Sequence, residues 1–241
     1  MKLNGNTLKA RVNGKNIQFN EHLKIIANDD AAQSEYAPGV PDANVLDDKS
    51  KIDLIERHFA EIMNILGLDL SDDSLKGTPH RVAKMFVKEI FSGLNPDNKP
   101  KIRLFENKFN YNQMLVEKDI KLNSYCEHHF VPIIGKVHIG YISNGSVIGL
   151  SKINRIVKYY AKRPQLQERL TQQIANELKK VLNTEDVAVV IEATHMCVTM
   201  RGVEDENSNT TSSSFHGRFL NNDIKNEFFT YINSSTRLIN K

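Results

Sequence analysis

Apolar residues recur at helical spacing after a polar start to the chain. Between Lys51 and Gly67 they fall every three or four positions, which predicts a helix that Gly67 ends. A second helix is expected from Thr78-Pro79 to about Phe91, because threonine caps helices and proline fits their first turn. The apolar positions of the first helix are Ile52, Ile55, Phe59, Ile62, Met63 and Leu66.

The pattern changes to strands over residues 102–148. Residues 133–142 are rich in β-branched and aromatic side chains, and Asn144-Gly145 supplies a turn between strands. Helical spacing returns at Ser151, which we expect to cap a helix, and a further helix is expected to begin at Pro164.

The last part of the chain is predicted to alternate in the same way. Residues 186–200 predict one long strand, and residues 222–232 predict a final helix. Mixed helices and strands without internal repeats indicate an α+β fold. A short hydroxyl run, Thr210–Ser214, is the one biased tract.

The polar residues 1–48 are weakly patterned, and Tyr36-Ala-Pro-Gly-Val-Pro41 breaks regular structure. We expect a loosely ordered N-terminal arm here. Residues 49–241 are expected to form one domain, with a helical part at 49–95 and a catalytic part at 96–241.

Composition limits the possible classes. The chain has 241 residues, is 40% hydrophobic and 25% charged, and has a net charge of +3, which alone does not favour nucleic-acid binding. Only 2 cysteines occur, too few for a typical disulfide-held secreted protein of this size. With no signal peptide and no long apolar stretch in the sequence, we expect a cytoplasmic protein with no membrane or nucleic-acid partner.

Basic residues are concentrated between Ser151 and Arg169, with Glu168 as the lone acid. Such a run is commonly a solvated helix face, and an anionic ligand is the alternative. The cations are Lys152, Arg155, Lys158, Lys162, Arg163 and Arg169.

The candidate chemistry begins at Cys126-Glu127-His128-His129. Thiolate and imidazole are good zinc ligands, and two intervening residues let Cys126 and His129 converge on one ion. In the predicted strand, His195 and Cys197 share a face, so Cys197 could supply a third ligand. Three ligands would leave a fourth tetrahedral position for water. Two inert buried thiols, or one disulfide, are the alternatives.

Two histidines, His128 and His195, remain beside the proposed ligands. Histidine titrates near neutrality, so both could move protons, although packing or support of the ligands would also explain them.

Candidate substrate contacts lie nearby in sequence. Ser151 would begin a helix whose first turn carries Lys152 and Arg155, and helix N-termini attract phosphate. Arg201 could add a cation, and no P-loop motif occurs. The Glu168 carboxylate could accept from the paired donors on the edge of guanine, which adenine lacks; an exposed, ion-paired glutamate is the alternative.

Together these strings resemble the GTP cyclohydrolase I family, in its order and at its spacing, over roughly Leu54 to Phe229. The matching motifs are Thr78-Pro-His-Arg-Val-Ala-Lys-Met85, Cys126-Glu-His-His129, Gly149-Leu-Ser-Lys-Ile-Asn-Arg155, Arg163-Pro-Gln-Leu-Gln-Glu-Arg-Leu-Thr171, His195-Met-Cys-Val-Thr-Met-Arg-Gly-Val203 and the hydroxyl run before Gly217. The sequence departs from the family's usual residues at two apolar places, Val131-Pro132-Ile133-Ile134 and Leu166. Neither departure affects a proposed role.

The resemblance implies a tunnelling fold, an antiparallel sheet with helices packed on one side, assembled into a ring that is typically a homodecamer. It implies conversion of GTP to 7,8-dihydroneopterin triphosphate and formate, in tetrahydrofolate and pterin biosynthesis. The implied residues are Cys126, His129 and Cys197 for Zn²⁺; His128 and His195 for proton transfer; Gln167, Glu168 and Ser151 for guanine; and Lys152, Arg155, Arg201 and Arg81 for triphosphate.

The motifs in the sequence argue against three other functions. A catalytically silent GTP-binding homologue should have lost a ligand or a histidine, and another tunnelling-fold pterin or deazapurine enzyme should show a different motif set. A zinc nucleobase deaminase would need HxE and PCxxC motifs, which the sequence lacks.

Overall fold

The computed structural model describes residues 9–12, 15–18 and 46–234. The chain divides into two compact units, Met1–Ala83 and Lys84–Lys241. Most of the expected arm, including its break at residues 36–41, lies outside the described residues. The division into an arm and a two-part domain stays a prediction.

The first unit contains a hairpin and two helices. The Asp47 side chain accepts a hydrogen bond from the Ser50 backbone N–H at 2.7 Å and caps the first helix, so this helix begins slightly before the expected Lys51. Gly67 follows it with φ +79°, the left-handed conformation that favours glycine after a helix. The elements are β1 (Lys9–Val12) paired with β2 (Lys15–Gln18), α1 (Asp48–Ile65) and α2 (Thr78–Met85).

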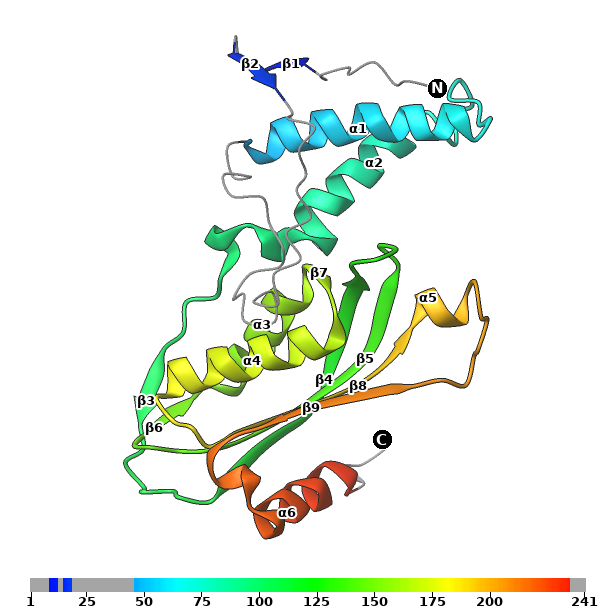
Figure 1. Ribbon diagram of the computed structural model, residues 1–241. Coiled ribbons are helices and arrows are strands. Elements are labelled where there is room, and N and C mark those ends of the chain that lie inside the picture. The colour runs from blue at the N-terminus through cyan, green and yellow to red at the C-terminus, as the bar shows by residue number, and fades with distance from the viewer. Residues whose placement is uncertain (1–8, 13–14, 19–45, 235–241) are drawn as a thin grey trace, which may run out of the picture. The chain divides into compact units, whose positions relative to one another are not determined.

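The second unit is built on a five-stranded sheet in the order β7-β4-β5-β8-β9, with a separate pair β3-β6 (Figure 1). All neighbours in the larger sheet are antiparallel except β4 and β7. The strands are β3 (Leu104–Glu106), β4 (Met114–Cys126), β5 (Pro132–Ile142), β6 (Ser146–Ile148), β7 (Pro164–Gln165), β8 (Val187–His195) and β9 (Thr210–Phe215).

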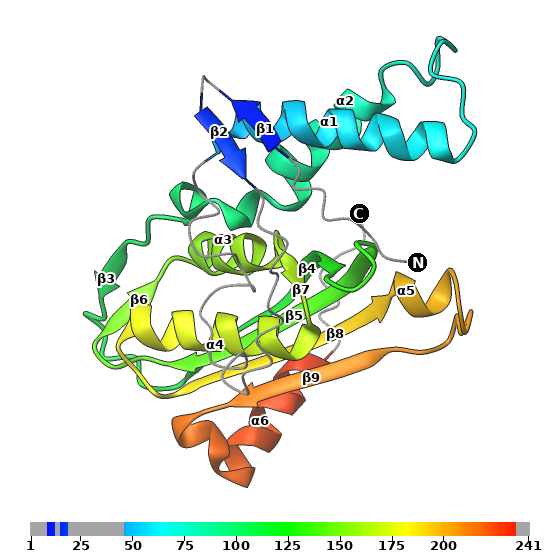
Figure 2. The same ribbon diagram turned by 45° about the horizontal axis from the view of Figure 1, so that its top comes forward.

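Helices pack on both faces of this sheet (Figures 1 and 2). The helix α2 continues into a π-helical turn that ends at Ile90, close to the expected end at Phe91. The helical elements are η3 (Phe86–Ile90), η4 (Ser92–Leu94), η5 (Pro96–Asn98), α3 (Leu150–Ala161), α4 (Gln167–Leu182), α5 (Met196–Thr199), η6 (Gly217–Leu220) and α6 (Asn222–Asn233).

The main core lies between the sheet and the pair α3 and α4. Leu170, Ile174 and Leu178 form the buried stripe of α4, at the helical spacing seen in the sequence. They belong to one cluster with alternate residues of the central strands, such as Val137 and Ile191. The largely antiparallel sheet with these two helices confirms the predicted α+β class, whereas helices on one side only is not what the structure shows, because α6 covers the other face.

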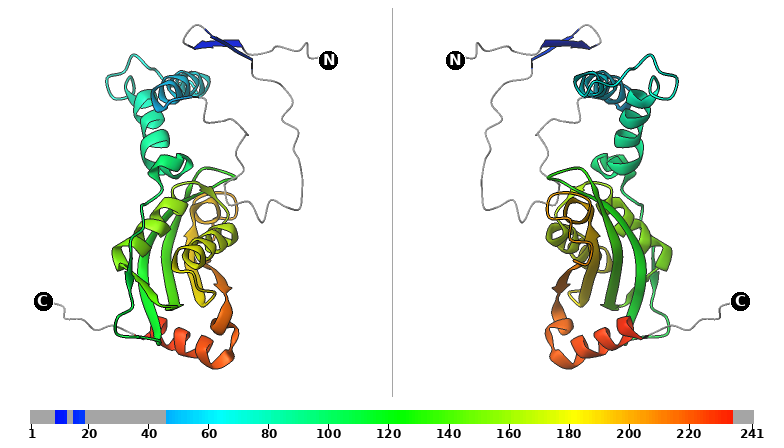
Figure 3. Two further views of the ribbon diagram at one scale, coloured as in Figure 1. Left: turned by 90° about the vertical axis from the view of Figure 1, so that its left-hand side faces the viewer. Right: turned by 90° about the vertical axis from the view of Figure 1, so that its right-hand side faces the viewer.

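The helix α6 packs on the opposite face (Figure 3). Phe228 of α6 and Phe219 of η6 form a second cluster with Met114, Ile142 and Val190. The expected tail helix at residues 222–232 is thus confirmed, and it gives the sheet a smaller core on its other side.

Three local predictions were wrong. The strand expected over residues 186–200 ends at His195, and Cys197 lies in the short helix α5, so these two residues do not share a strand face. Pro164 lies in β7, and α4 begins only at Gln167. Ser151 occupies the first turn of α3, whose cap is Gly149 with no side-chain hydrogen bond.

Candidate active site

A tight turn joins β4 to β5 and carries three of the predicted site residues. Backbone hydrogen bonds from Cys126 N to Val131 O and from Phe130 N to Cys126 O, both 2.9 Å, close this turn, and Phe130 adopts φ +54°. We call residues 126–131 the ligand turn. It buries Cys126 and leaves His128 and His129 exposed.

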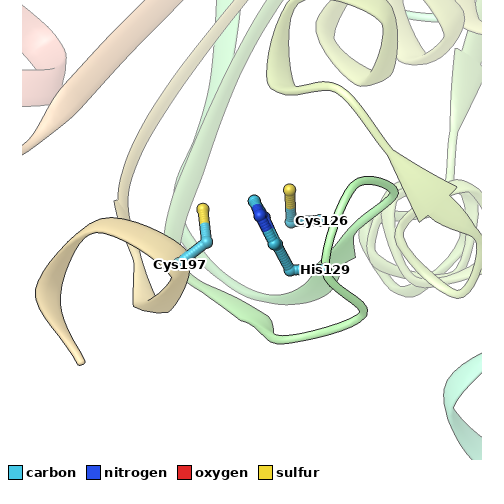
Figure 4. Close-up of side chains that lie close together, drawn as sticks. All are labelled: Cys126, His129 and Cys197. Carbon is cyan, nitrogen blue, oxygen red and sulfur yellow. The ribbon is translucent and has the colours of Figure 1, made fainter. Parts of the chain in front are cut away.

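The helix α5 brings Cys197 to the ligand turn. The ligand atoms of Cys126, His129 and Cys197 all lie within 4.8 Å of one another, and the three side chains converge (Figure 4). Zinc bonds of 2.0–2.3 Å in a tetrahedron would need separations of about 3.5–3.8 Å, close to this spacing. Both cysteines are free thiols, so the disulfide alternative is not formed. The donor set therefore fits zinc.

The electrostatics of the two thiols favour a cation. Burial raises the pKa of the Cys197 thiol, and the neighbouring Cys126 raises it further. The Cys197 thiol therefore resists losing its proton beside a second sulfur atom. A divalent cation reverses this preference, because it stabilises both thiolates.

An ion pair supports the ligand turn from α4. Arg169 Nη2 contacts Glu127 Oε2 and also donates to Pro164 O at 3.1 Å, while Arg169 Nε donates to Gln165 Oε1 at 3.2 Å. The sequence placed Arg169 in a basic run and gave Glu127 no role. In the sequence, only the position of Glu127 between Cys126 and His128 could have indicated that it supports the site.

Two other contacts connect the predicted residues around the turn. His128 Nδ1 lies 3.7 Å from Cys126 Sγ, and Arg201 Nη1 lies 2.9 Å from His129 Nε2. Arg201, expected to bind phosphate, is therefore directly beside the candidate metal ligands.

The second predicted histidine lies in a separate polar environment. His195 Nε2 is 2.7 Å from Oε1 of Gln167, a residue only 1% exposed. Burial lowers the pKa of His195, and the charge of Glu168 partly opposes this shift. We call Gln167, Thr171, His195 and Ser212 the amide cluster, since a hydrogen-bond chain through the Gln167 amide joins them.

The remaining substrate candidates are less tightly grouped. Ser151 and Lys152 occupy the first turn of α3, Arg155 follows on the same helix, and Glu168 is exposed at the start of α4. Within the described part of the chain, no hydrogen bond or ion pair joins these α3 residues to the ligand turn. Arg81 lies in the first compact unit, where Arg81 Nη2 donates to Ser74 O and Thr78 Oγ1.

The basic run is not one solvated face. Arg163 is 3% exposed, donates from Nε to Gly93 O at 2.9 Å, and lies over the rings of Tyr159 and Tyr160. With Arg169 bound to Glu127, two of the six cations support the structure itself, and these contacts are not visible in the sequence.

Comparisons with known proteins point in one direction. A family model described as GTP cyclohydrolase I matches residues 55–233. The chain is 57% identical to GTP cyclohydrolase 1 of Flavobacterium johnsoniae over 221 residues, 92% of this chain and 99% of that protein. It is 56% identical to the GTP cyclohydrolase 1 of Aeromonas hydrophila over 73% of this chain and 81% of that one. It is 54% identical to the GTP cyclohydrolase 1 of Enterobacter sp., over 78% of this chain and 85% of that one.

Proposed function

The chain belongs to the GTP cyclohydrolase I family, and we propose that it opens the purine ring of GTP at a single zinc ion. It is an enzyme with this family's activity, so GTP and water give 7,8-dihydroneopterin triphosphate and formate. The observation that carries the proposal is the convergence of Cys126, His129 and Cys197 on one point.

The metal ligands in this proposal are two thiolates and one imidazole. Three protein ligands leave one tetrahedral position open, which is typical of catalytic rather than structural zinc sites. When bound, zinc would lower the pKa of a water molecule and so supply hydroxide near neutral pH. The Glu127–Arg169 pair would hold the ligand turn in place around the ion.

Proton transfer falls to His128 and His195. Opening the imidazole ring of GTP needs a proton delivered to N7 as C8 is attacked, and the later closure onto the amine needs further proton movement. His128 lies beside Cys126, and His195 directly precedes the helix that carries Cys197. These positions, one beside Cys126 and one just before the helix that carries Cys197, support the two roles.

Recognition of guanine falls to Glu168. Its carboxylate is exposed at the first turn of α4, and within the described residues it has no hydrogen-bond partner. A free carboxylate edge suits the paired N1–H and N2–H₂ donors of guanine. Ser151 near guanine stays a prediction, as does Gln167, whose side-chain amide is already bonded to other groups.

The triphosphate would be bound by scattered cations. Lys152 and Arg155 lie on α3, and Arg201 reaches the ligand turn. Arg81 would come from a neighbouring subunit, as the family resemblance implies. Four cations would balance most of the charge of a triphosphate.

A homo-oligomeric ring, typically a decamer in the family, is supported by two surfaces. The edge strand β9 and most of β4 have no outer partner strand among the described residues, so either edge could pair with another copy. The helix α1 leaves Ile62, Ile65 and Leu66 exposed at 49%, 84% and 70%. Among the described helices, none is long and apolar enough to cross a membrane; a cytoplasmic location stays a prediction.

A combined assay tests the proposed function. Purified protein should contain about one zinc per chain and release formate from GTP but not from ATP. A silent GTP-binding homologue would bind GTP and release no formate, and another enzyme of the fold would release none from GTP. Either result would reject the proposal.

Shared active sites can be tested by subunit mixing. Glu168→Ala and Arg81→Ala proteins, each inactive, are unfolded together and reassembled. If the two residues serve one pocket from different subunits, some pockets regain both and activity returns. Activity that stays absent from demonstrably mixed oligomers contradicts this arrangement.

A further inference from the structure

We propose that Gln167 is a positioning residue that fixes the tautomer of His195, with the ring hydrogen on Nε2 and the free lone pair on Nδ1. The inference rests on the proposed function for its kinetic consequence, whereas the tautomer itself is a property of the folded chain. It gives Gln167 a role different from a contact with guanine.

Two backbone carbonyls determine which way the Gln167 amide faces. Gln167 Nε2 lies 3.1 Å from Ile191 O and 2.9 Å from Thr210 O. Carbonyl oxygens only accept hydrogen bonds, so the amide NH₂ must face them. The reversed amide would place Gln167 Oε1 against both carbonyl oxygens and leave three acceptors without a proton among them in a buried site.

A chain of hydroxyls leads to the same orientation. Thr171 Oγ1 donates to Gln167 O at 2.8 Å, and its one proton is then used. The Ser212 hydroxyl must therefore donate in the 2.7 Å contact between Ser212 Oγ and Thr171 Oγ1. Ser212 Oγ is left as an acceptor, and Gln167 Nε2 lies 3.1 Å from it. The two hydroxyl groups therefore require the Gln167 NH₂ on this side, as the two backbone carbonyls do.

The orientation of the amide sets the proton on the imidazole. With its NH₂ facing the carbonyls, Gln167 presents Oε1 to His195 Nε2 at 2.7 Å. An amide oxygen cannot donate, so His195 Nε2 must carry the hydrogen. Neutral His195 then has its only basic lone pair at Nδ1.

Selective ¹⁵N labelling of histidine gives a direct test. The His195 ring should show a protonated Nε2 and an unprotonated Nδ1 in the wild-type protein at a pH where it is neutral. Gln167→Met keeps the side-chain size but removes the acceptor, and should give a mixture of tautomers.

Gln173→Met is the matched control. Gln173 lies on the same helix, is 6% exposed, and its Oε1 accepts from Gln165 Nε2 at 2.9 Å without contacting His195. This variant loses a buried amide hydrogen bond but should leave the His195 tautomer unchanged. It separates a general loss of packing from a specific effect on the histidine.

Kinetics separate positioning from substrate binding. Gln167→Met should lower kcat on the order of 10²-fold with KM for GTP unchanged, as expected for the wrong tautomer of a catalytic histidine or loss of its supporting contact. Adding Gln167→Met to His195→Ala should cost nothing further. A raised KM with kcat retained would instead make Gln167 a guanine contact and overturn the proposal.

The spectroscopic arm decides the case even without activity. A wild-type His195 protonated at Nδ1 alone would overturn the proposal, and no variant needs to fold for this result. If the wild-type enzyme releases no formate from GTP, the proposed function fails, while the tautomer measurement still supports or rejects the role of Gln167.

Discussion

The ligand turn leads into β5, and His195 of the amide cluster pairs with Ile133 near the start of that strand, but the two regions are organised in opposite ways. In the ligand turn, His128 and His129 are exposed, and the ligand atoms of Cys126 and His129 converge with that of Cys197 from α5. In the amide cluster, the amide and hydroxyl groups already bond to protein partners. The first region is arranged for a metal to complete, whereas the second is ordered by the fold alone.

The largest expected effect falls on the three candidate metal ligands. Cys197→Ala should abolish stoichiometric zinc binding and formate release, because the remaining two ligands cannot hold the ion. Zinc analysis and the formate assay measure this. Chelator-treated wild-type protein is the control and should recover with added zinc, unlike the variant. Full zinc content and activity in Cys197→Ala would show that the ligands are misassigned.

The next-largest effect separates the role of the two histidines from metal binding. His128→Ala and His195→Ala should each keep zinc and lose about 10²–10⁴ in formate release, the usual cost of removing a general acid or base. Metal content and rate are measured on the same preparations. If both variants turn over GTP at near-normal rates, neither histidine belongs to the mechanism.

A smaller effect tests how the ligand turn is supported. Arg169→Gln should weaken zinc binding by about 10–100-fold, as is common when a group that orients metal ligands is removed. Glu127→Gln should cause a similar loss, and the double variant should lose little more, because both changes break the same ion pair. Competition with a metal chelator gives the affinities. Additive losses would mean that the two residues act separately.

The smallest effect lies inside the amide cluster. Ser212→Ala removes one of three acceptors near Gln167 Nε2, so we expect about 1 kcal/mol of lost stability and only a modest fall in rate. Ser213→Ala on the same strand is the control, since Ser213 is exposed and on the other face. Denaturant unfolding compares the two. Equal stability of both variants would remove Ser212 from the cluster.

The sequence predicted the ligand turn better than the amide cluster. Thiols and imidazoles at close spacing have few alternative uses, so Cys126, His129 and Cys197 could be grouped before any coordinates. The route to Cys197 was wrong, because strand propensity continues past His195 although the chain turns into α5. Periodicity does not show where a strand ends when the next residues are also apolar.

The amide cluster could not be predicted from residue types. The hydroxyl run at Thr210–Ser214 was noticed, but nothing in it indicates that Ser212 meets Gln167 across 45 positions of sequence. Two of the determining groups, Ile191 O and Thr210 O, belong to the backbone, and every residue has such a carbonyl. They accept from the Gln167 amide only because β8 pairs with β9 beside α4.

These two carbonyls also set a limit for protein engineering. No side-chain substitution deletes a backbone oxygen, so the orientation of the Gln167 amide is protected against most point mutations. The same feature makes the site hard to transplant. A designer who copies Gln167 and His195 onto another scaffold without β8 and β9 would transfer both side chains but lose the two carbonyls that orient the Gln167 amide and so place the hydrogen on His195 Nε2.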